Sequence, residues 1–274
     1  MADLAPTRLL LVGCGKMGGA MLRGWLARGL APRRSLVIEP NPAELEDLIR
    51  QGVRVEPGAE AIPPDFQPDV VVLAVKPQMM EGAIGGYARF ARPETLFLSI
   101  AAGKTIAYFR RYLGEGAAIV RAMPNTPAAI GRGISVAVAS SPVTAAQRGL
   151  ADILLAACGE VAWVEEEGLI DPVTALSGGG PAYVFLLIET LAEAGRKAGL
   201  PADLALRLAR VTVSGAGELA RHSPDSAQQL RRNVTSPKGT TLEALNILMA
   251  ENGIQPLFDR AIAAATRRSR ELAG

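Results

Sequence analysis

Short apolar runs alternate with helical stretches up to about residue 165 of the chain. Runs such as Val70–Val75 are continuously apolar, which is typical of strands covered on both faces of a parallel sheet. The pattern predicts strands at Arg8–Val12, Leu36–Glu39, Val70–Val75, Thr95–Ile100, Ala118–Ala122, Ser135–Ala139 and Val161–Val164. It predicts helices between them at Gly18–Arg28, Ala43–Gln51, Thr105–Leu113 and Thr144–Ala157.

After residue 168 the strand-like runs cease, and helical periodicity continues to the end of the chain. The predicted helices are Pro181–Ala198, Pro201–His222, Ser226–Asn233, Thr240–Glu251 and Pro256–Leu272. We therefore expect an α/β Rossmann-type domain with a predominantly parallel sheet over residues 1–167, followed by an all-α domain over residues 168–274. Small residues at Ser214–Gly217 favour close helix packing, either within the chain or against another subunit.

Composition and charge exclude several classes of protein. The chain is 49% hydrophobic, so it folds, and 29 basic against 27 acidic residues leave a dispersed net charge of +2 that gives no reason to expect a nucleic-acid partner. Two distant cysteines and a single histidine, His222, predict neither a disulfide framework nor a metal site nor an imidazole-based triad. No apolar run approaches the ~20 residues of a membrane span, and the N-terminus lacks a signal peptide's pattern, so we expect a cytoplasmic protein without a membrane partner.

A glycine-rich fingerprint lies between the first strand and the first helix. Its first glycine permits a tight turn, its second allows a pyrophosphate to approach the backbone, and its third allows the helix to pack on the strand. The free N–H groups at the helix start favour an anion. The alternative is a structural glycine-rich turn, but the context favours dinucleotide binding by Gly13, Cys14, Gly15, Lys16, Met17 and Gly18.

Glu39, at the end of the second predicted strand, is the candidate for choosing between NADH and NADPH. A carboxylate there accepts hydrogen bonds from both ribose hydroxyls and repels a 2′-phosphate. Arg33, Arg34 and Asn41 lie nearby in sequence and would receive a phosphate if Glu39 pointed away. We expect NADH or use of both cofactors, with Glu39 and Asn41 in the cofactor site; the alternative is that Glu39 merely ends a strand.

Three later strands end in small or turn-forming residues, where doubly wound sheets bind their ligands. These segments are Ala74–Pro77, Ile100–Gly103 and Met123–Pro127. Lys76 directly follows a buried run, so we favour a cofactor contact over an ordinary solvated lysine. The expected cofactor contacts are Ala74, Val75, Lys76, Pro77, Ala101, Ala102 and Asn125.

Two segments in the helical half, Ser177–Tyr183 and Asn233–Thr241, combine glycines with hydroxyl groups at predicted helix starts. Free N–H groups there favour an anion such as a substrate carboxylate. The alternative is plain helix capping by Ser177 and Thr240. We favour the binding interpretation, and we place Ser177 and Gly178 with the cofactor.

These motifs together make the chain similar, nearly end to end, to the Δ1-pyrroline-5-carboxylate reductase family. The resemblance is carried by Gly13–Gly18, Ala74–Pro77, Met123–Pro127, Leu169–Asp171, Ser177–Tyr183 and above all Val234-Thr-Ser-Pro-Lys-Gly-Thr-Thr241. It implies reduction of pyrroline-5-carboxylate, a cyclic imine carboxylate, to L-proline with NADPH or NADH as the final step of proline biosynthesis. It also implies a dimer with interlocking helical domains, either alone or assembled further into a decamer, and makes residues 168–274 the substrate-binding and dimerisation domain.

The resemblance also implies the residue roles. Thr241 matches the family threonine that hydrogen-bonds the ring nitrogen and is the candidate catalytic residue, and no metal is expected. The loop before it holds the substrate carboxylate, and Glu167 matches a position that approaches the substrate. The candidate substrate residues are Asn233, Ser236, Lys238, Gly239, Thr240, Thr241 and Glu167. Two residues depart from the family pattern: Gly179 replaces a serine, and Lys238 replaces a glycine.

Other functions remain open at this point. A β-hydroxyacid-type dehydrogenase would use a lysine of its helical domain as the acid, but only Lys197 and Lys238 follow residue 168. A reductase acting on another cyclic imine would share the same site. A catalytically idle paralogue that binds nucleotide as a scaffold is the alternative from a different class, and Thr241 argues against it.

Overall fold

The computed structural model describes residues 4–273, which pack as two compact units. The sheet unit comprises the residues up to Gly178 together with those from Ala265 onward, and the helical unit comprises Gly179–Ala264. The chain passes between the units twice, both times inside a helical stretch. The functional division at residue 167 into a dinucleotide-binding and a substrate-binding domain stays a prediction.

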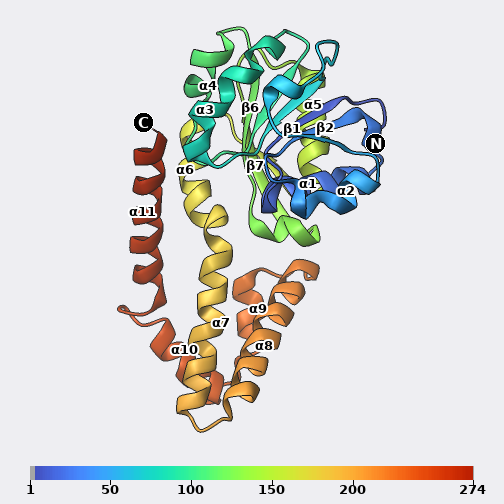
Figure 1. Ribbon diagram of the computed structural model, residues 1–274. Coiled ribbons are helices and arrows are strands. Elements are labelled where there is room, and N and C mark those ends of the chain that lie inside the picture. The colour runs from blue at the N-terminus through green and yellow to red at the C-terminus, as the bar shows by residue number, and fades with distance from the viewer. Residues whose placement is uncertain (1–3, 274) are drawn as a thin grey trace. The chain divides into compact units, whose positions relative to one another are not determined.

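The sheet unit is built on one eight-stranded sheet in the order β3-β2-β1-β4-β5-β6-β7-β8 (Figure 1). Neighbouring strands are parallel except β6 and β7, which are antiparallel because the short segment joining them holds no crossover helix. The predominantly parallel sheet predicted from the sequence is therefore confirmed. The strands are β1 Leu9–Val12, β2 Ser35–Ile38, β3 Arg54–Glu56, β4 Val70–Leu73, β5 Leu96–Ser99, β6 Ala118–Met123, β7 Gly133–Ala139 and β8 Gly159–Trp163.

Helices cover both faces of this sheet, which explains the continuously apolar strands. In β4, Val70 and Val72 join one buried cluster while Val71 and Leu73 join the other. The first cluster includes side chains of α1 (Lys16–Ala27), α2 (Glu46–Arg50) and α5 (Ala145–Ala156). The second includes side chains of α3 (Met80–Ile84), α4 (Ile106–Leu113) and α6 (Ile170–Val173).

Three elements of the sheet unit, β3, α3 and the four-residue helix α6, were not predicted. Strand β3 spans only Arg54–Glu56 at the sheet edge, and none of its residues is fully buried, so it gives little apolar signal. Helix α3 is a single short turn of helix between two 3₁₀ segments, Pro77–Met79 and Gly85–Phe90. Elements this short fall below the length at which periodicity is informative.

The helical unit contains α7 (Gly180–Lys197), α8 (Ala202–His222), α9 (Ala227–Asn233), α10 (Thr240–Leu248) and most of α11 (Ile254–Ala273). Helices α7 and α8 lie side by side, and a Cβ on Gly195 would lie 3.3 Å from the Cβ of Ala205 (Figure 1). In contrast, nothing in the described chain lies within 4 Å of a Cβ built on Gly215 or Gly217. Close packing within the chain therefore does not explain the small residues of α8.

The predicted helix start at Pro181 is confirmed, since α7 begins at Gly180 and Pro181 stands in its first turn, where its missing N–H interrupts no α-helical hydrogen bond. The helical structure before this start was not predicted. Helix α6 continues into a π-helical turn at Thr174–Gly178, and only Gly179 separates that turn from α7. Ser177 and Gly178 therefore belong to the π turn rather than to the start of α7.

If α6, the π turn and α7 are taken as one helix, Glu167–Lys197 is long enough to span a membrane. An 18-residue window within it has a mean hydropathy of 1.3, and 6% of that window is buried. The expectation that no segment has this length and composition is therefore wrong, because the break assumed near Pro181 divided the apolar stretch. Core helices of soluble proteins, which bury their apolar side chains against other protein segments, have the same length and hydropathy. The exposed apolar residues on this stretch are Leu169, Leu176, Val184, Phe185, Leu186, Leu187 and Leu191.

Candidate functional site

The loop between β1 and α1 forms a cradle that requires glycine at two positions. Gly13 has φ +88°, and a Cβ there would lie 2.9 Å from Val75. A Cβ on Gly18 would overlap the carbonyl oxygen of Gly13. Gly15 is different, because nothing lies within 4 Å of its Cβ position and it is exposed. The cradle is thus closed by protein at Gly13 and Gly18 and open to a ligand at Gly15.

Helix α1 presents its positive end to this opening. It begins at Lys16, its N-cap Gly15 makes no side-chain hydrogen bond, and its first turn contains no acidic residue. The uncapped N–H groups and the helix dipole together favour a phosphate at this point. The open space at Gly15 fits the pyrophosphate of a dinucleotide, and the six residues of the fingerprint lie where the sequence predicted.

Glu39 directly follows β2 and lies against the cradle. Its Oε2 accepts a hydrogen bond from the backbone N–H of Cys14 at 2.9 Å, and its Oε1 accepts one from Asn41 N–H at 3.2 Å. Of the nearby arginines, Arg34 donates to the carbonyl of Pro6, and Arg33 is exposed. The structure thus turns Glu39 toward the nucleotide loop, so a 2′-phosphate bound beside it would meet a carboxylate.

Burial raises the pKa of Cys14 to about 11, and burial raises that of Cys158 equally, to about 11. Both thiols are therefore neutral and unreactive at neutral pH. Among residues 4–273 no group of three His, Cys, Asp or Glu side chains is placed to hold a metal ion.

The other predicted cofactor residues follow β4, β5 and β6, which are neighbours in the sheet. Ala74, Val75, Lys76 and Pro77 follow β4, with Lys76 exposed at the start of a 3₁₀ turn. Ala101 and Ala102 follow β5, where Ala101 N–H donates to Ser99 Oγ at 3.2 Å. Because the carboxyl ends of adjacent parallel strands share one edge, these segments lie beside the glycine loop along the same edge.

Asn125 and Ser177 are brought together from distant parts of the sequence. Asn125 Nδ2 donates to Ser177 Oγ at 3.2 Å, and its Oδ1 accepts from Ile134 N–H at 3.0 Å. A Cβ on Gly178 would overlap the Met123 side chain. The glycine of the π turn therefore lets the helix approach the end of β6, and Ser177 serves as a partner of Asn125 rather than as a helix cap.

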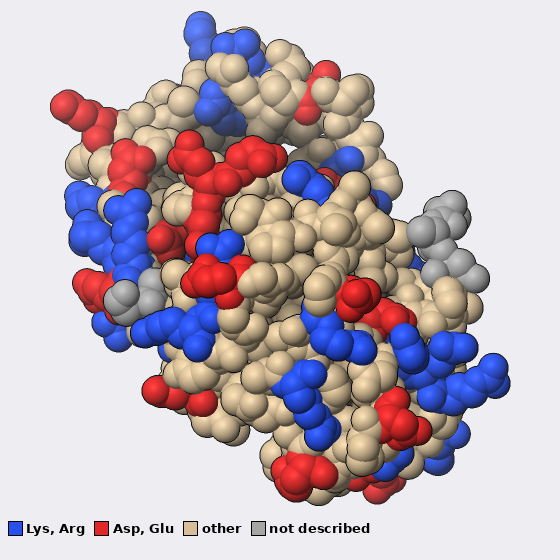
Figure 2. Space-filling view, turned by 90° about the horizontal axis from the view of Figure 1, so that it is seen from above, with Lys and Arg blue, Asp and Glu red and all other residues tan. Residues whose placement is uncertain are grey.

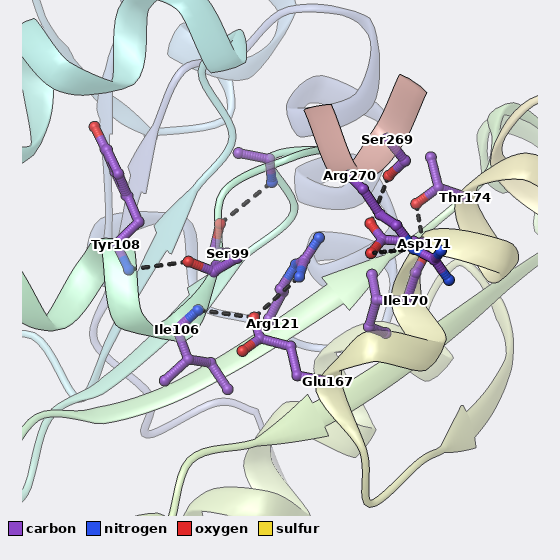
Figure 3. Close-up of polar contacts among 12 residues, drawn as sticks. Ser99, Ile106, Tyr108, Arg121, Glu167, Ile170, Asp171, Thr174, Ser269 and Arg270 are labelled. Carbon is purple, nitrogen blue, oxygen red and sulfur yellow. Dashed lines mark hydrogen bonds and ion pairs between the residues drawn. The ribbon is translucent and has the colours of Figure 1, made fainter. Parts of the chain in front are cut away.

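A buried ion pair beneath this edge was not predicted. Arg121 lies in β6 with 3% of its side chain exposed, and its Nη1 lies 2.9 Å from Glu167 Oε1. The same oxygen accepts a hydrogen bond from Ile106 N–H, at the start of α4, at 2.8 Å (Figure 3). Glu167 therefore joins β6 to α4, while its contact with substrate stays a prediction. The sequence contained one signal for this ion pair, namely an arginine inside the otherwise apolar strand β6.

Replacing Glu167 with Gln should lower the free energy of unfolding by about 3 kcal/mol, because a buried guanidinium loses its counter-charge. Chemical denaturation measures this change. Glu166→Gln is the matched control, since Glu166 is the exposed neighbour and should change stability by less than about 0.5 kcal/mol. Equal stability of the two variants would show that the pair contributes nothing.

Six of the seven predicted substrate residues lie in the helical unit, around the segment that joins α9 to α10, whereas Glu167 belongs to the sheet unit. Asn233 ends α9, where its Oδ1 accepts from Gln229 Nε2 at 2.7 Å. Thr240 begins α10, and the N-cap is Gly239, which has no side chain to cap the helix. The alternative interpretation of Ser177 and Thr240 as capping residues is therefore wrong. Thr240 and Thr241 are exposed at an uncapped helix start.

Lys238 has the one positive φ, +61°, among the non-glycine residues of the described chain. A side chain in this left-handed region costs roughly 1–2 kcal/mol, so a glycine fits this position more easily. Having lysine instead of glycine at position 238 therefore places an exposed ammonium group in the loop before Thr240, and it strains the backbone of Lys238.

Comparison with known proteins identifies the family to which this chain belongs. The model for the pyrroline-5-carboxylate reductase dimerisation domain matches residues 167–272, and the model described as NADP oxidoreductase, coenzyme F420-dependent, matches residues 8–103. A pyrroline-5-carboxylate reductase of Pseudomonas aeruginosa is 39% identical over 272 residues, with 98% of each chain covered. The chain belongs to the pyrroline-5-carboxylate reductase family.

Solved structures of family members agree with this assignment. The structure of a pyrroline-5-carboxylate reductase from Coxiella burnetii has a TM-score of 0.90 at 35% identity, covering 98% of this chain and 99% of that one. A Plasmodium falciparum pyrroline carboxylate reductase with NADP bound has a TM-score of 0.83 at 28% identity, with 98% of each chain covered. Residues 167–272 thus match the dimerisation domain of the family, and the exposed apolar side chains of α7 lie within this domain.

Proposed function

We propose that this chain reduces Δ1-pyrroline-5-carboxylate to L-proline with NADH or NADPH. The observation that carries the proposal is the uncapped helix start at Thr240 and Thr241 in a member of this reductase family whose sheet unit also has a complete dinucleotide cradle. Bound NADH or NADPH supplies a hydride from C4 of its nicotinamide. The hydride forms a C–H bond at the imine carbon, the C=N bond becomes single, and the nitrogen keeps the proton that it acquired before binding.

The chain's own residues then bind and orient the substrate. The N–H groups at the start of α10 and the charge of Lys238 attract the carboxylate, with Asn233, Ser236 and Gly239 at the same loop. The Thr241 hydroxyl hydrogen-bonds the ring nitrogen. Because the imine takes its proton from water, no histidine is required, and catalysis rests on proximity and orientation.

The test is oxidation of NADH and of NADPH, measured by loss of nicotinamide absorbance with pyrroline-5-carboxylate on the purified protein. Substrate-dependent oxidation with formation of proline is the expected result. Binding of both cofactors without oxidation would instead favour the scaffold, and oxidation only with another cyclic imine would identify a different substrate.

Glu39 should set the cofactor preference of this reaction. Because its carboxylate already accepts hydrogen bonds at the nucleotide loop, NADH should be used at least as well as NADPH. Glu39→Gln removes the charge and should shift the ratio of kcat/KM toward NADPH by roughly tenfold, which is about 1.4 kcal/mol. An unchanged ratio would mean that Glu39 does not select the cofactor. Arg33→Gln, at an exposed neighbour, is the control.

For assembly, we propose a homodimer, or a decamer built from such dimers, working in the cytoplasm. The small residues of α8 support a subunit contact, since Gly215 and Gly217 have open space around them in the single chain. Positive and negative side chains are interspersed over the face shown in Figure 2, without one large patch of either sign. Light scattering at several protein concentrations distinguishes the dimer from the decamer.

A further inference from the structure

The end of α11 returns to the sheet unit and is fixed there. Ser269 is 5% exposed, and its Oγ donates to Asp171 Oδ1 at 2.7 Å, while Arg270 Nε lies 3.9 Å from Asp171 Oδ2 (Figure 3). Asp171 belongs to α6, whose neighbour Ile170 is buried in the core of the sheet unit. The last turn of α11 is therefore anchored to the body that carries the nucleotide loop.

The same turn packs against the segment that follows β5. A Cβ built on Gly103 would lie 3.0 Å from Leu272 Cβ and 3.2 Å from the Leu272 carbonyl oxygen. Gly103 has φ +71° and is buried. It ends the segment Ile100–Gly103, which contains the expected cofactor contacts Ala101 and Ala102.

This segment is held at each end by other contacts. Before it, Ser99 Oγ accepts from Ala101 N–H; after it, Glu167 accepts from Ile106 N–H (Figure 3). Between these two points the chain turns at Gly103, a residue with wide conformational freedom. Leu272 lies against this turn through its Cβ and its backbone carbonyl group, while 49% of the residue is exposed.

We propose that the last turn of α11, Ser269–Leu272, positions the segment Ile100–Gly103 for the cofactor, with Ser269 as the positioning residue that anchors this turn to Asp171. The inference rests on the proposed function, in which this segment contacts the cofactor. When the turn of α11 is released from Asp171, the turn at Gly103 samples other conformations, and the apparent dissociation constant rises as the fraction of the binding-competent conformation falls. The chain's C-terminal end then belongs to the cofactor half of the site as well as to the dimerisation domain.

The test compares Ser269→Ala with Arg268→Ala in the full chain. Arg268 lies on the preceding position of the same helix end, with 66% of its side chain exposed, and pairs with Glu271, so it controls for general loosening of the helix end. The NADPH dissociation constant, measured by nucleotide fluorescence without substrate, should rise roughly fivefold in Ser269→Ala and less than about twofold in Arg268→Ala. The KM for pyrroline-5-carboxylate should stay unchanged.

A Ser269→Ala variant that binds NADPH like the wild type, or that only lowers the unfolding midpoint, would overturn the proposal. Leu272→Ala is the second variant, because it keeps the Cβ and the carbonyl group that lie against Gly103 and should leave the NADPH dissociation constant within about twofold of the wild type. An equal loss of affinity in Leu272→Ala and Ser269→Ala would overturn the assignment to the Ser269 anchor. Binding without turnover of pyrroline-5-carboxylate in the wild type would refute the proposed function alone. A wild-type chain that binds no nucleotide would refute both.

Discussion

Thr241→Ala should lower kcat/KM for pyrroline-5-carboxylate by about 100-fold, the loss typical of removing one hydrogen bond to the reacting group in a transition state. Thr241 follows Thr240 at the uncapped start of α10, so its hydroxyl lies beside the N–H groups proposed for the carboxylate. The substitution leaves the cradle between β1 and α1 untouched. Steady-state kinetics together with NADPH binding measure the two effects separately.

The control for this prediction is Thr241→Ser, which keeps the hydroxyl and should recover most of the activity. NADPH affinity should remain within about twofold of the wild type in both variants. If Thr241→Ala turned over substrate as fast as the wild type, Thr241 would have no part in the reaction. An equal loss in the Ser variant would assign the effect to the methyl group.

Two glycines of the nucleotide loop should respond in different ways to the same substitution. Gly18→Ala places a Cβ onto the Gly13 carbonyl oxygen, so it should destabilise the fold by about 3 kcal/mol or more. Gly15→Ala meets no atom within 4 Å and keeps an ordinary φ of −67°, so stability should be unchanged. Its methyl group nevertheless occupies the open side of the cradle, where the pyrophosphate is expected.

Gly15→Ala should therefore weaken NADPH binding by roughly tenfold or more, at least 1.4 kcal/mol, at an unaltered unfolding midpoint. Calorimetry and thermal unfolding measure the two quantities on the same sample. Tight NADPH binding by Gly15→Ala would place the pyrophosphate elsewhere. A stable Gly18→Ala variant would contradict the geometry of the loop.

The sequence was most informative where a pattern has one physical meaning. The continuously apolar run around β4 required a sheet covered on both faces, and the glycine fingerprint between β1 and α1 required a cradle. The helix predicted from Thr240 begins there in the structure, as α10. In each case the local sequence and the fold agree.

The failures came where several residues far apart determine the structure. The π turn at Thr174–Gly178 was not predicted, because it depends on the packing of Gly178 against Met123. The pair between Arg121 and Glu167 depends on contacts across the sheet unit that no local pattern encodes. The contact of Leu272 with Gly103 likewise joins residues that are far apart in the sequence.

Transfer of deuterium from NADH that carries deuterium at both hydrogen positions of the nicotinamide C4 tests the central claim most directly. The wild-type protein is supplied with pyrroline-5-carboxylate, and the product is analysed by mass spectrometry and NMR. The account predicts L-proline carrying one deuterium at C5, because the hydride passes directly from the cofactor to the imine carbon. Unlabelled proline, or consumption of the cofactor without proline, would contradict it.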